Sequence, residues 1–224
     1  MPMDDVLAQL VPLAAVVAVN PLPVIAMILV LQTANGRRAG ACFVAAWLAA
    51  LLALGGVAIL IANHTDLYGS GSSSTVARLI RAGVGLLLVV LAVRKWMSRP
   101  RAGEDAKMPA WMNAVASTTP AKSARLGALL AAGNPKNIAV TLAAAASIVE
   151  AGFTIPQELG ALVSYVVLAT LGVGVPFTVV MLLGSRADDV LAGWGRWLDR
   201  HNATLMSVVL LVIGLLLIAA AITG

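Results

Sequence analysis

Charged residues are scarce in this chain of 224 residues. They make up 11% of it, whereas a typical soluble domain carries about a quarter. Hydrophobic residues make up 60%, and the mean hydropathy is +0.95. This balance excludes an ordinary soluble globular protein and predicts an integral membrane protein.

Cysteine and histidine are almost missing as well. Cys42 is the only cysteine, so the chain can form no internal disulfide and cannot be a dithiol carrier. The two histidines, His64 and His201, belong to no cluster with metal-ligand spacing. We find no nucleophile–base pair and no paired carboxylates of the kind that catalysis needs. The sequence therefore predicts a protein that is not an enzyme and that needs no metal or cofactor.

Acidic residues are absent from the interior of the apolar segments. All ten lie in the predicted termini, loops or helix ends: Asp4, Asp5, Asp66, Glu104, Asp105, Glu150, Glu158, Asp188, Asp189 and Asp199. A carboxylate proton relay, or a cation site built from carboxylates, would need such residues inside a span. Both are therefore disfavoured.

Six apolar segments reach the roughly 20 residues that cross a bilayer. They lie near Val6–Thr33, Ala39–Ala62, Val76–Val93, Ala124–Val149, Leu159–Leu183 and Ala203–Ile222. Because the N-terminus is acidic, unlike the basic start of a signal peptide, we expect the first segment to remain. The predicted fold class is an all-α polytopic membrane protein with six transmembrane helices.

The basic residues are distributed unevenly around these segments. Twelve of the fifteen lie in or beside the 1–2, 3–4 and 5–6 loops: Arg37, Arg38, Arg94, Lys95, Arg99, Arg101, Lys107, Lys122, Arg125, Arg186, Arg196 and Arg200. The positive-inside rule places these loops in the cytoplasm and both termini outside. Trp96, Trp111, Trp194 and Trp197 fall on the same flank, as an interfacial belt does. Membrane topology thus explains the net charge of +5 without a nucleic-acid partner.

Two Asn-Pro pairs, Asn20-Pro21 and Asn134-Pro135, interrupt long apolar runs. Proline donates no backbone hydrogen bond, and it pushes the preceding residue out of the helical region. Aligning the pairs, at an offset of 114 residues, divides the chain into a first three-helix repeat (1–97), a cytoplasmic linker (98–120) and a second repeat (121–224). Three spans per half make the second half enter the membrane inverted. Inverted repeats with broken helices are typical of transporters with a midplane site.

Seven residues at the breaks are the candidate substrate-binding residues: Asn20, Pro21, Pro23, Asn134, Pro135, Lys136 and Asn137. Lys136 is the only charged side chain well inside a predicted span, where a charge costs about 2.5–3.5 kcal/mol. Its ammonium could attract an anionic group, couple protons, or only pair with carbonyls freed at the break. Each asparagine could cap the new helix or contact a ligand.

The motifs at both breaks resemble those of a known family. Asn20-Pro-Leu-Pro23 with Gly36-Arg-Arg38 is similar to the first-helix signature of the lysine exporter (LysE) superfamily. Within it, Pro109-Ala-Trp-Met112, Gly127-Ala-Leu129 and Asn134-Pro-Lys-Asn137 resemble the second-half signature of the glycolipid and peptidolipid addressing (GAP) branch, which includes the sulfolipid-addressing (Sap) proteins. Leu22 stands where the amino-acid exporters of the superfamily carry a glycine.

The resemblance implies a six-span protein of an actinobacterial inner membrane that moves an envelope lipid towards the surface. It would use no nucleotide of its own, and it could work beside a larger lipid exporter. Three hypotheses remain open. They are a secondary transporter or export factor for an envelope glycolipid, peptidolipid or related anionic molecule; an exporter of amino acids or other small solutes; and a non-transporting scaffold for a larger exporter. Membrane lipids are the expected surroundings, and a homodimer is possible.

Overall fold

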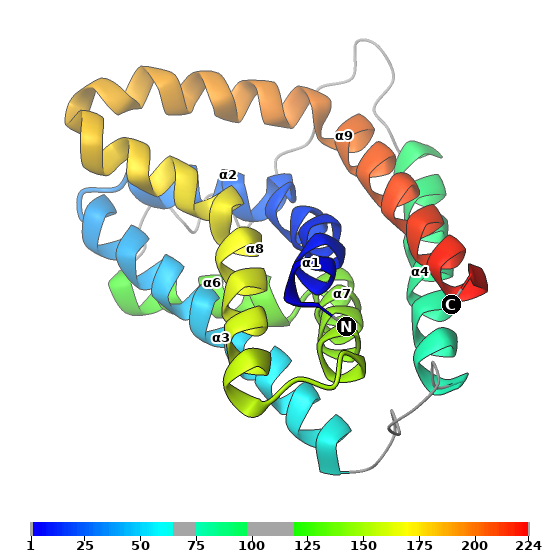
Figure 1. The fold of residues 1–224 in the computed structure, drawn as a ribbon. Coiled ribbons are helices and arrows are strands. Elements are labelled where there is room, and N and C mark those ends of the chain that lie inside the picture. The colour runs from blue at the N-terminus through cyan, green and yellow to red at the C-terminus, as the bar shows by residue number, and fades with distance from the viewer. Residues whose placement is uncertain (1, 65–74, 98–118, 224) are drawn as a thin grey trace.

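The computed structural model describes residues 2–64, 75–97 and 119–223, and all regular structure in these ranges is helical. The elements are α1 (Met3–Ala18), α2 (Pro21–Leu31), α3 (Gly36–His64), α4 (Thr75–Met97), α6 (Pro120–Ala132), α7 (Pro135–Glu150), α8 (Ile155–Leu183), the short 3-10 helix η1 (Gly184–Arg186) and α9 (Ala187–Thr223). Figure 1 shows their arrangement. Most of the predicted linker lies outside the described residues.

Both predicted helix breaks are present. α1 ends at Ala18, and α2 begins at Pro21 with a bend of 57° between the two helices. α6 ends at Ala132, and α7 begins at Pro135. Proline suits the first position of a helix, since the backbone N–H that it lacks would have no partner there. Each Asn-Pro pair therefore ends one helix and starts the next.

Two helices, α3 and α8, are each long and apolar enough to cross a membrane, and the bent α1–α2 pair is a third when counted as one span. The remaining predicted segments are helical as α4, α6 with α7, and α9. They do not meet that criterion of length and apolarity within the described residues. The described residues thus form an all-helical membrane protein with two to three candidate spans by length and composition.

The helix that the sixth segment predicts begins much earlier than expected. The sequence predicts it near Ala203, whereas α9 begins at Ala187 and continues to Thr223. In Figure 1 the orange start of α9 runs across the top of the molecule, and the red part turns down along α4. The hydropathy of the sequence detects only the later, apolar part of α9. The start of α9 is amphipathic, with Leu191 buried and Arg196 exposed.

The helices pack in corresponding pairs across the two halves. α3 packs against α6 and α7, and α8 packs against α1 and α2. α4 also contacts α7, as α9 contacts α2, and the later part of α9 packs along α4. At their crossing, a Cβ on Gly85 would lie 2.9 Å from the Gly214 carbonyl oxygen, and one on Gly214 would lie 2.9 Å from that of Gly85. Glycine at both positions lets the two backbones touch.

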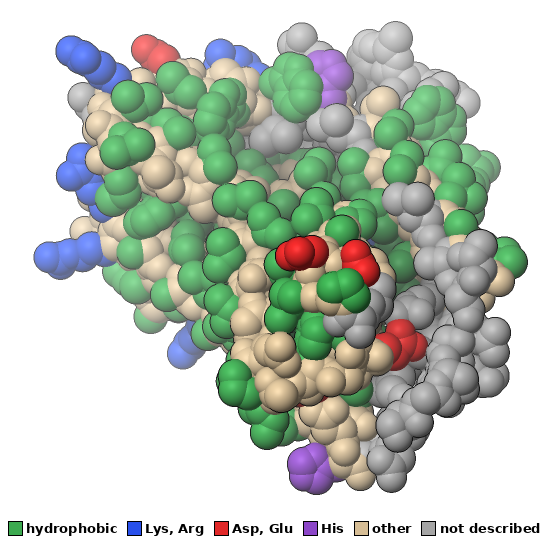
Figure 2. Space-filling model, in the orientation of Figure 1, with side chains coloured by type: hydrophobic (Ala, Val, Ile, Leu, Met, Phe, Trp, Pro, Cys, Tyr) green, Lys and Arg blue, Asp and Glu red, His purple; other side chains and the backbone are tan. Residues whose placement is uncertain are grey.

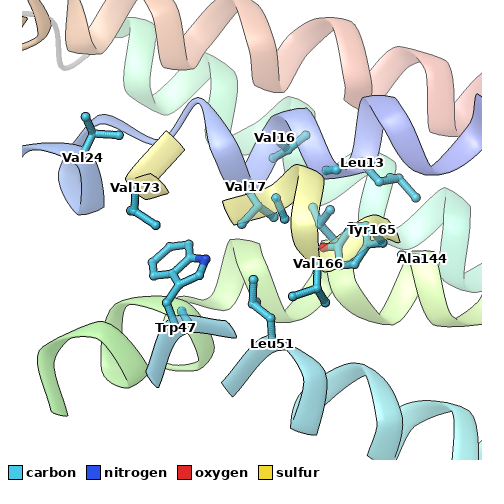
Figure 3. Packing of buried hydrophobic residues seen from close by; sticks show 14 of the residues in the cluster. Leu13, Val16, Val17, Val24, Trp47, Leu51, Ala144, Tyr165, Val166 and Val173 are labelled. Carbon is cyan, nitrogen blue, oxygen red and sulfur yellow. The ribbon is translucent and has the colours of Figure 1, made fainter. Parts of the chain in front are cut away.

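The core lies between the broken helices and the two long helices α3 and α8. Trp47, Tyr165 and Phe43 are its largest fully buried side chains. Figure 3 shows Trp47 of α3 pointing towards Val17 of α1 and Val173 of α8. The core therefore surrounds the end of α1, where the first break begins.

Basic and apolar side chains occupy different parts of the surface. Most of the lysine and arginine side chains visible in Figure 2 gather along the left and upper left margin, and hydrophobic side chains cover much of the rest of this face. Arg37, Lys122 and Arg186, for example, lie on three different helices and are exposed. The charge bias of the sequence is thus also a spatial bias.

Candidate functional site

At the end of α1, the backbone carbonyl of Val16 has no partner from its own helix. Val19 N–H donates to the Ala15 carbonyl at 2.9 Å, and Asn20 N–H donates to the Val17 carbonyl at 3.4 Å. In a continuous helix, Asn20 N–H would instead reach the carbonyl of Val16. Pro21 follows and has no N–H to give. The first break therefore bares the Val16 carbonyl inside the protein.

Lys136 occupies this bared carbonyl. Its Nζ donates a hydrogen bond of 2.7 Å to the Val16 oxygen, and the side chain is only 6% exposed. Lys136 belongs to the first turn of α7, which follows the second break. The bond therefore joins the start of α7 to the end of α1, just before the first break. An ammonium has three donors, and no carboxylate pairs with this one among the described residues. The site thus holds a buried lysine amino group whose identified partner is a neutral carbonyl.

The two other polar residues of the second break hold the backbone of α6 and α7. Asn134 Oδ1 accepts from Lys136 N–H at 3.0 Å and caps α7. Asn137 Nδ2 donates to the carbonyls of Leu130 and Ala131, both at 3.1 Å, near the end of α6. Asn137 is fully buried, and its Oδ1 has no partner in the described part of the chain. Amide side chains therefore satisfy much of the backbone freed at this break.

The first break lacks such a cap. Asn20 precedes α2 and is buried, but its side chain makes no capping hydrogen bond. Pro21 and Pro23 are buried beside it, whereas Pro135 at the second break is exposed. The structure thus links the two breaks through Lys136 and leaves Pro135 exposed.

Polar residues elsewhere in the spans have structural partners. Ser164, Thr170 and Thr178 each donate to the carbonyl four residues earlier in α8. Thr141 of α7 and Tyr165 of α8 share a hydrogen bond of 3.0 Å. Among the described residues, no group of three or more His, Cys, Asp or Glu side chains could hold a metal ion. These residues therefore add packing contacts and no metal chemistry.

A cavity of about 590 Å³ lies beside the first break. Its lining is almost entirely apolar: Ala18, Val19, Val24, Leu171, Gly172, Val175, Pro176, Trp194 and Trp197. None of the seven residues predicted from the sequence lines it. Gly172 brings α8 against the end of α1, because a Cβ at this position would fall on the Ala18 carbonyl oxygen. The cavity is thus lined by the end of α1, α2, α8 and the start of α9.

Sequence reasoning missed most of these lining residues. Gly172 and Pro176 stand out in the sequence as helix-bending residues in an apolar segment, and Trp194 and Trp197 read as interfacial anchors. Those signals do not indicate that these four residues line the same cavity. The Asn-Pro breaks indicate that carbonyls are freed, but the sequence does not indicate that Lys136 meets the Val16 carbonyl of the other break.

Comparison with known proteins gives one family. No match was found among curated proteins or among solved structures. Residues 10–223 match the family described as Sap, sulfolipid-1-addressing protein, which confirms the resemblance to the Sap branch. Because this match covers nearly the whole chain, and the broken helices that carry the resemblance are present, the protein belongs to the Sap, sulfolipid-1-addressing protein family.

Proposed function

We propose that the protein is a secondary transporter or export factor that moves an envelope lipid, or a related anionic molecule, towards the cell surface. The family description names a sulfolipid-addressing role, which supports export of a lipid rather than an enzymatic reaction. In this proposal the membrane is the cytoplasmic membrane of the cell, and a site between the two halves opens to each side in turn.

The packing of the helices supports an inverted repeat of two three-helix units. If α1, α2, α3 and α4 correspond to α6, α7, α8 and α9, the most extensive contacts between the halves have counterparts, whereas the contacts of α9 with α1 and α8 have none among the described residues. The contact of α3 with α6 corresponds to that of α8 with α1, and the contact of α4 with α7 to that of α9 with α2. Two halves related in this way can exchange roles, which is the basis of alternating access in transporters with inverted repeats.

The bond from Lys136 to the Val16 carbonyl is the observation that carries the proposal. It places a buried ammonium where the two halves meet. Buried charges in membrane proteins are costly and commonly mark substrate or ion pathways. An anionic group of the substrate would replace the Val16 carbonyl as the partner of the ammonium, because an ammonium binds an anion more strongly than it binds a neutral carbonyl. Release of Val16 would then free the two halves to move.

The apolar cavity favours a lipid over a small solute. An amino acid would bring two charges against walls that offer almost no polar groups, and unpaired buried charges are unfavourable. A hydrocarbon chain requires no such partners. We therefore rank export of a lipidic molecule above export of amino acids.

Substitution of Lys136 tests the proposal against a purely structural role. We expect Lys136→Met to lower delivery of the envelope lipid to the cell surface at least about tenfold, with the protein still present in the membrane. The variant leaves the buried Val16 carbonyl without its donor, which costs about 1–3 kcal/mol, so the amount of protein in the membrane is measured alongside delivery. Lipidomics of the cell surface, in cells that carry the variant or lack the gene, measures the effect.

The matched control is Lys122→Met, which removes an exposed lysine from α6. It should leave delivery unchanged. If Lys136→Met and Asn20→Ala both deliver lipid normally at normal protein levels, the midplane site is wrong. A scaffold for a larger exporter would give that result, and substitutions on an exposed helix face would then abolish delivery.

A further inference from the structure

The cavity beside the first break is open towards the surroundings of the helices. Its wall from α8 includes Leu171 and Val175, which are 50% and 46% exposed, and Val19 at the break is 40% exposed. These residues lie in α8, which is apolar enough to span a membrane, and in the bent α1–α2 pair. In a bilayer such side chains face lipid. A molecule in the membrane could therefore enter from the side.

One end of the cavity is close to the proposed midplane site. Ala18 and Val19 line it, and they follow Val16, which accepts the hydrogen bond from Lys136. A rise of about 1.5 Å per residue puts these positions within one turn of α1. The apolar cavity and the buried ammonium are thus neighbouring parts of the same region.

The amphipathic start of α9 forms another part of the cavity lining. Trp194 and Trp197 line the cavity and remain partly exposed. Tryptophan is enriched at the level of lipid headgroups, where its ring contacts hydrocarbon and its N–H reaches water. Arg196 lies between them in the chain and is exposed, as is Arg186 just before α9. Among the described side chains of this stretch, Asp189 is the acidic one.

We propose that this cavity is a loading site that binds one hydrocarbon chain of an anionic amphiphile from the cytoplasmic leaflet. The chain lies against Leu171 and Val175, and its end reaches Ala18 at the break. The acidic headgroup stays beside Trp194 and Trp197, where Arg196 complements its charge. This inference rests on the proposed function, because it supplies the entry step for a molecule that then meets Lys136.

The dimensions and the chemistry of the cavity fit this occupant. Its volume of about 590 Å³ lies within the roughly 300–1,000 Å³ of small-molecule sites. Long cationic side chains at membrane surfaces extend towards the headgroups while their stems cover apolar surface. A neutral chain without a headgroup would lose the contact with Arg196. The site should therefore prefer a fatty acid to the corresponding alcohol.

Photo-crosslinking of the full-length protein in nanodiscs tests the site. The probe is palmitic acid with a diazirine near the end of its chain, and unlabelled palmitic acid is the competitor. We expect competable crosslinks in the peptides that contain Ala18–Val24 and Leu171–Pro176. Val175→Phe, which fills the cavity from an exposed position, should reduce them at least about fivefold. Exposed positions accept such substitutions with little loss of stability.

Val167→Phe is the matched control. Val167 is on the same helix and 52% exposed, and it does not line the cavity. This variant should crosslink like the natural protein. Arg196→Gln should raise the concentration of palmitic acid needed for competition several-fold, and it should leave competition by hexadecanol unchanged.

Crosslinks spread evenly along α8 and not displaced by palmitic acid would show only bulk lipid around the helices and would overturn the loading site. So would equal effects of Val175→Phe and Val167→Phe. The two proposals can fail separately. Normal lipid delivery in Lys136→Met with competable crosslinks in the cavity would overturn the midplane site and support the loading site. Loss of delivery in Lys136→Met without cavity crosslinks would do the reverse.

Discussion

Asn20 and Asn134 stand at the same position of the two breaks, immediately before a proline, yet they have different surroundings. Asn134 caps its helix through a hydrogen bond of 3.0 Å to Lys136 N–H, whereas Asn20 makes no capping bond. Asn20 is also more deeply buried than Asn134. A buried amide without a capping role is the better candidate for contact with a substrate, because its donors and acceptor remain available.

Stability measurements on the two alanine variants should separate these roles. Asn134→Ala removes a helix cap and should lower the free energy of unfolding by about 1 kcal/mol. Asn20→Ala removes no cap and should lower it clearly less. Unfolding of the purified protein in detergent, followed by circular dichroism, measures both. Equal losses would contradict the assignment of Asn134 as the cap and of Asn20 as a free amide.

At the scale of helices, the contact between α1 and α8 fixes the position of the first break. Gly172 of α8 packs directly against the Ala18 carbonyl at the end of α1. A larger residue at position 172 would not fit. A Cβ added to Gly174, two residues further along α8, would meet only the Thr170 Cγ2 atom among the described residues, at 3.9 Å. The two glycines thus differ in function although they look alike in the sequence.

Replacing each glycine by alanine should reveal this difference. Gly172→Ala forces the two helices apart, and overpacking of this kind costs about 1–3 kcal/mol. It should lower the thermal stability of the protein and also disturb the cavity. Gly174→Ala fits its surroundings and should be neutral or slightly stabilising, since alanine favours a helix. The melting temperatures of the two variants in detergent measure this difference. An unchanged melting temperature of Gly172→Ala would show that the close approach of α1 and α8 is not required.

At the scale of the whole molecule, the two ends of α3 and α8 carry different chemistry. At one end, Asn63 Nδ2 donates to both carboxylate oxygens of Glu158 at 3.0 and 3.3 Å. At the other end, a Cβ on Gly184 would meet the Arg37 guanidinium at 3.5 Å. The exposed arginines gather at this second end, which we assign to the cytoplasm on the positive-inside rule.

Cysteine labelling tests the assigned orientation. In a Cys42→Ser background, His64→Cys and Arg38→Cys each place a thiol at an exposed position at opposite ends of α3. An impermeant maleimide added to intact spheroplasts should label His64→Cys at once. It should label Arg38→Cys only after the membrane is permeabilised. The opposite pattern would place both termini in the cytoplasm and reverse the proposed direction of loading.

Local features of the sequence were predicted well. Proline has no N–H, so both helix breaks follow from the chain itself, and α2 and α7 begin at Pro21 and Pro135. The start of α9 was not predicted, because an amphipathic helix has no long apolar run. The count of six spans and the inverted repeat stay predictions.

The sequence by itself determined the class of the protein, the two breaks and the uneven distribution of positive charge. These depend on each residue's own solvation and backbone freedom. Only the tertiary structure decided what the breaks meet. Lys136 bonds to a carbonyl 120 residues away, and the cavity draws its walls from four helices. Contacts between such distant residues depend on how the helices pack, and a backbone carbonyl or a gap between side chains has no letter in the sequence.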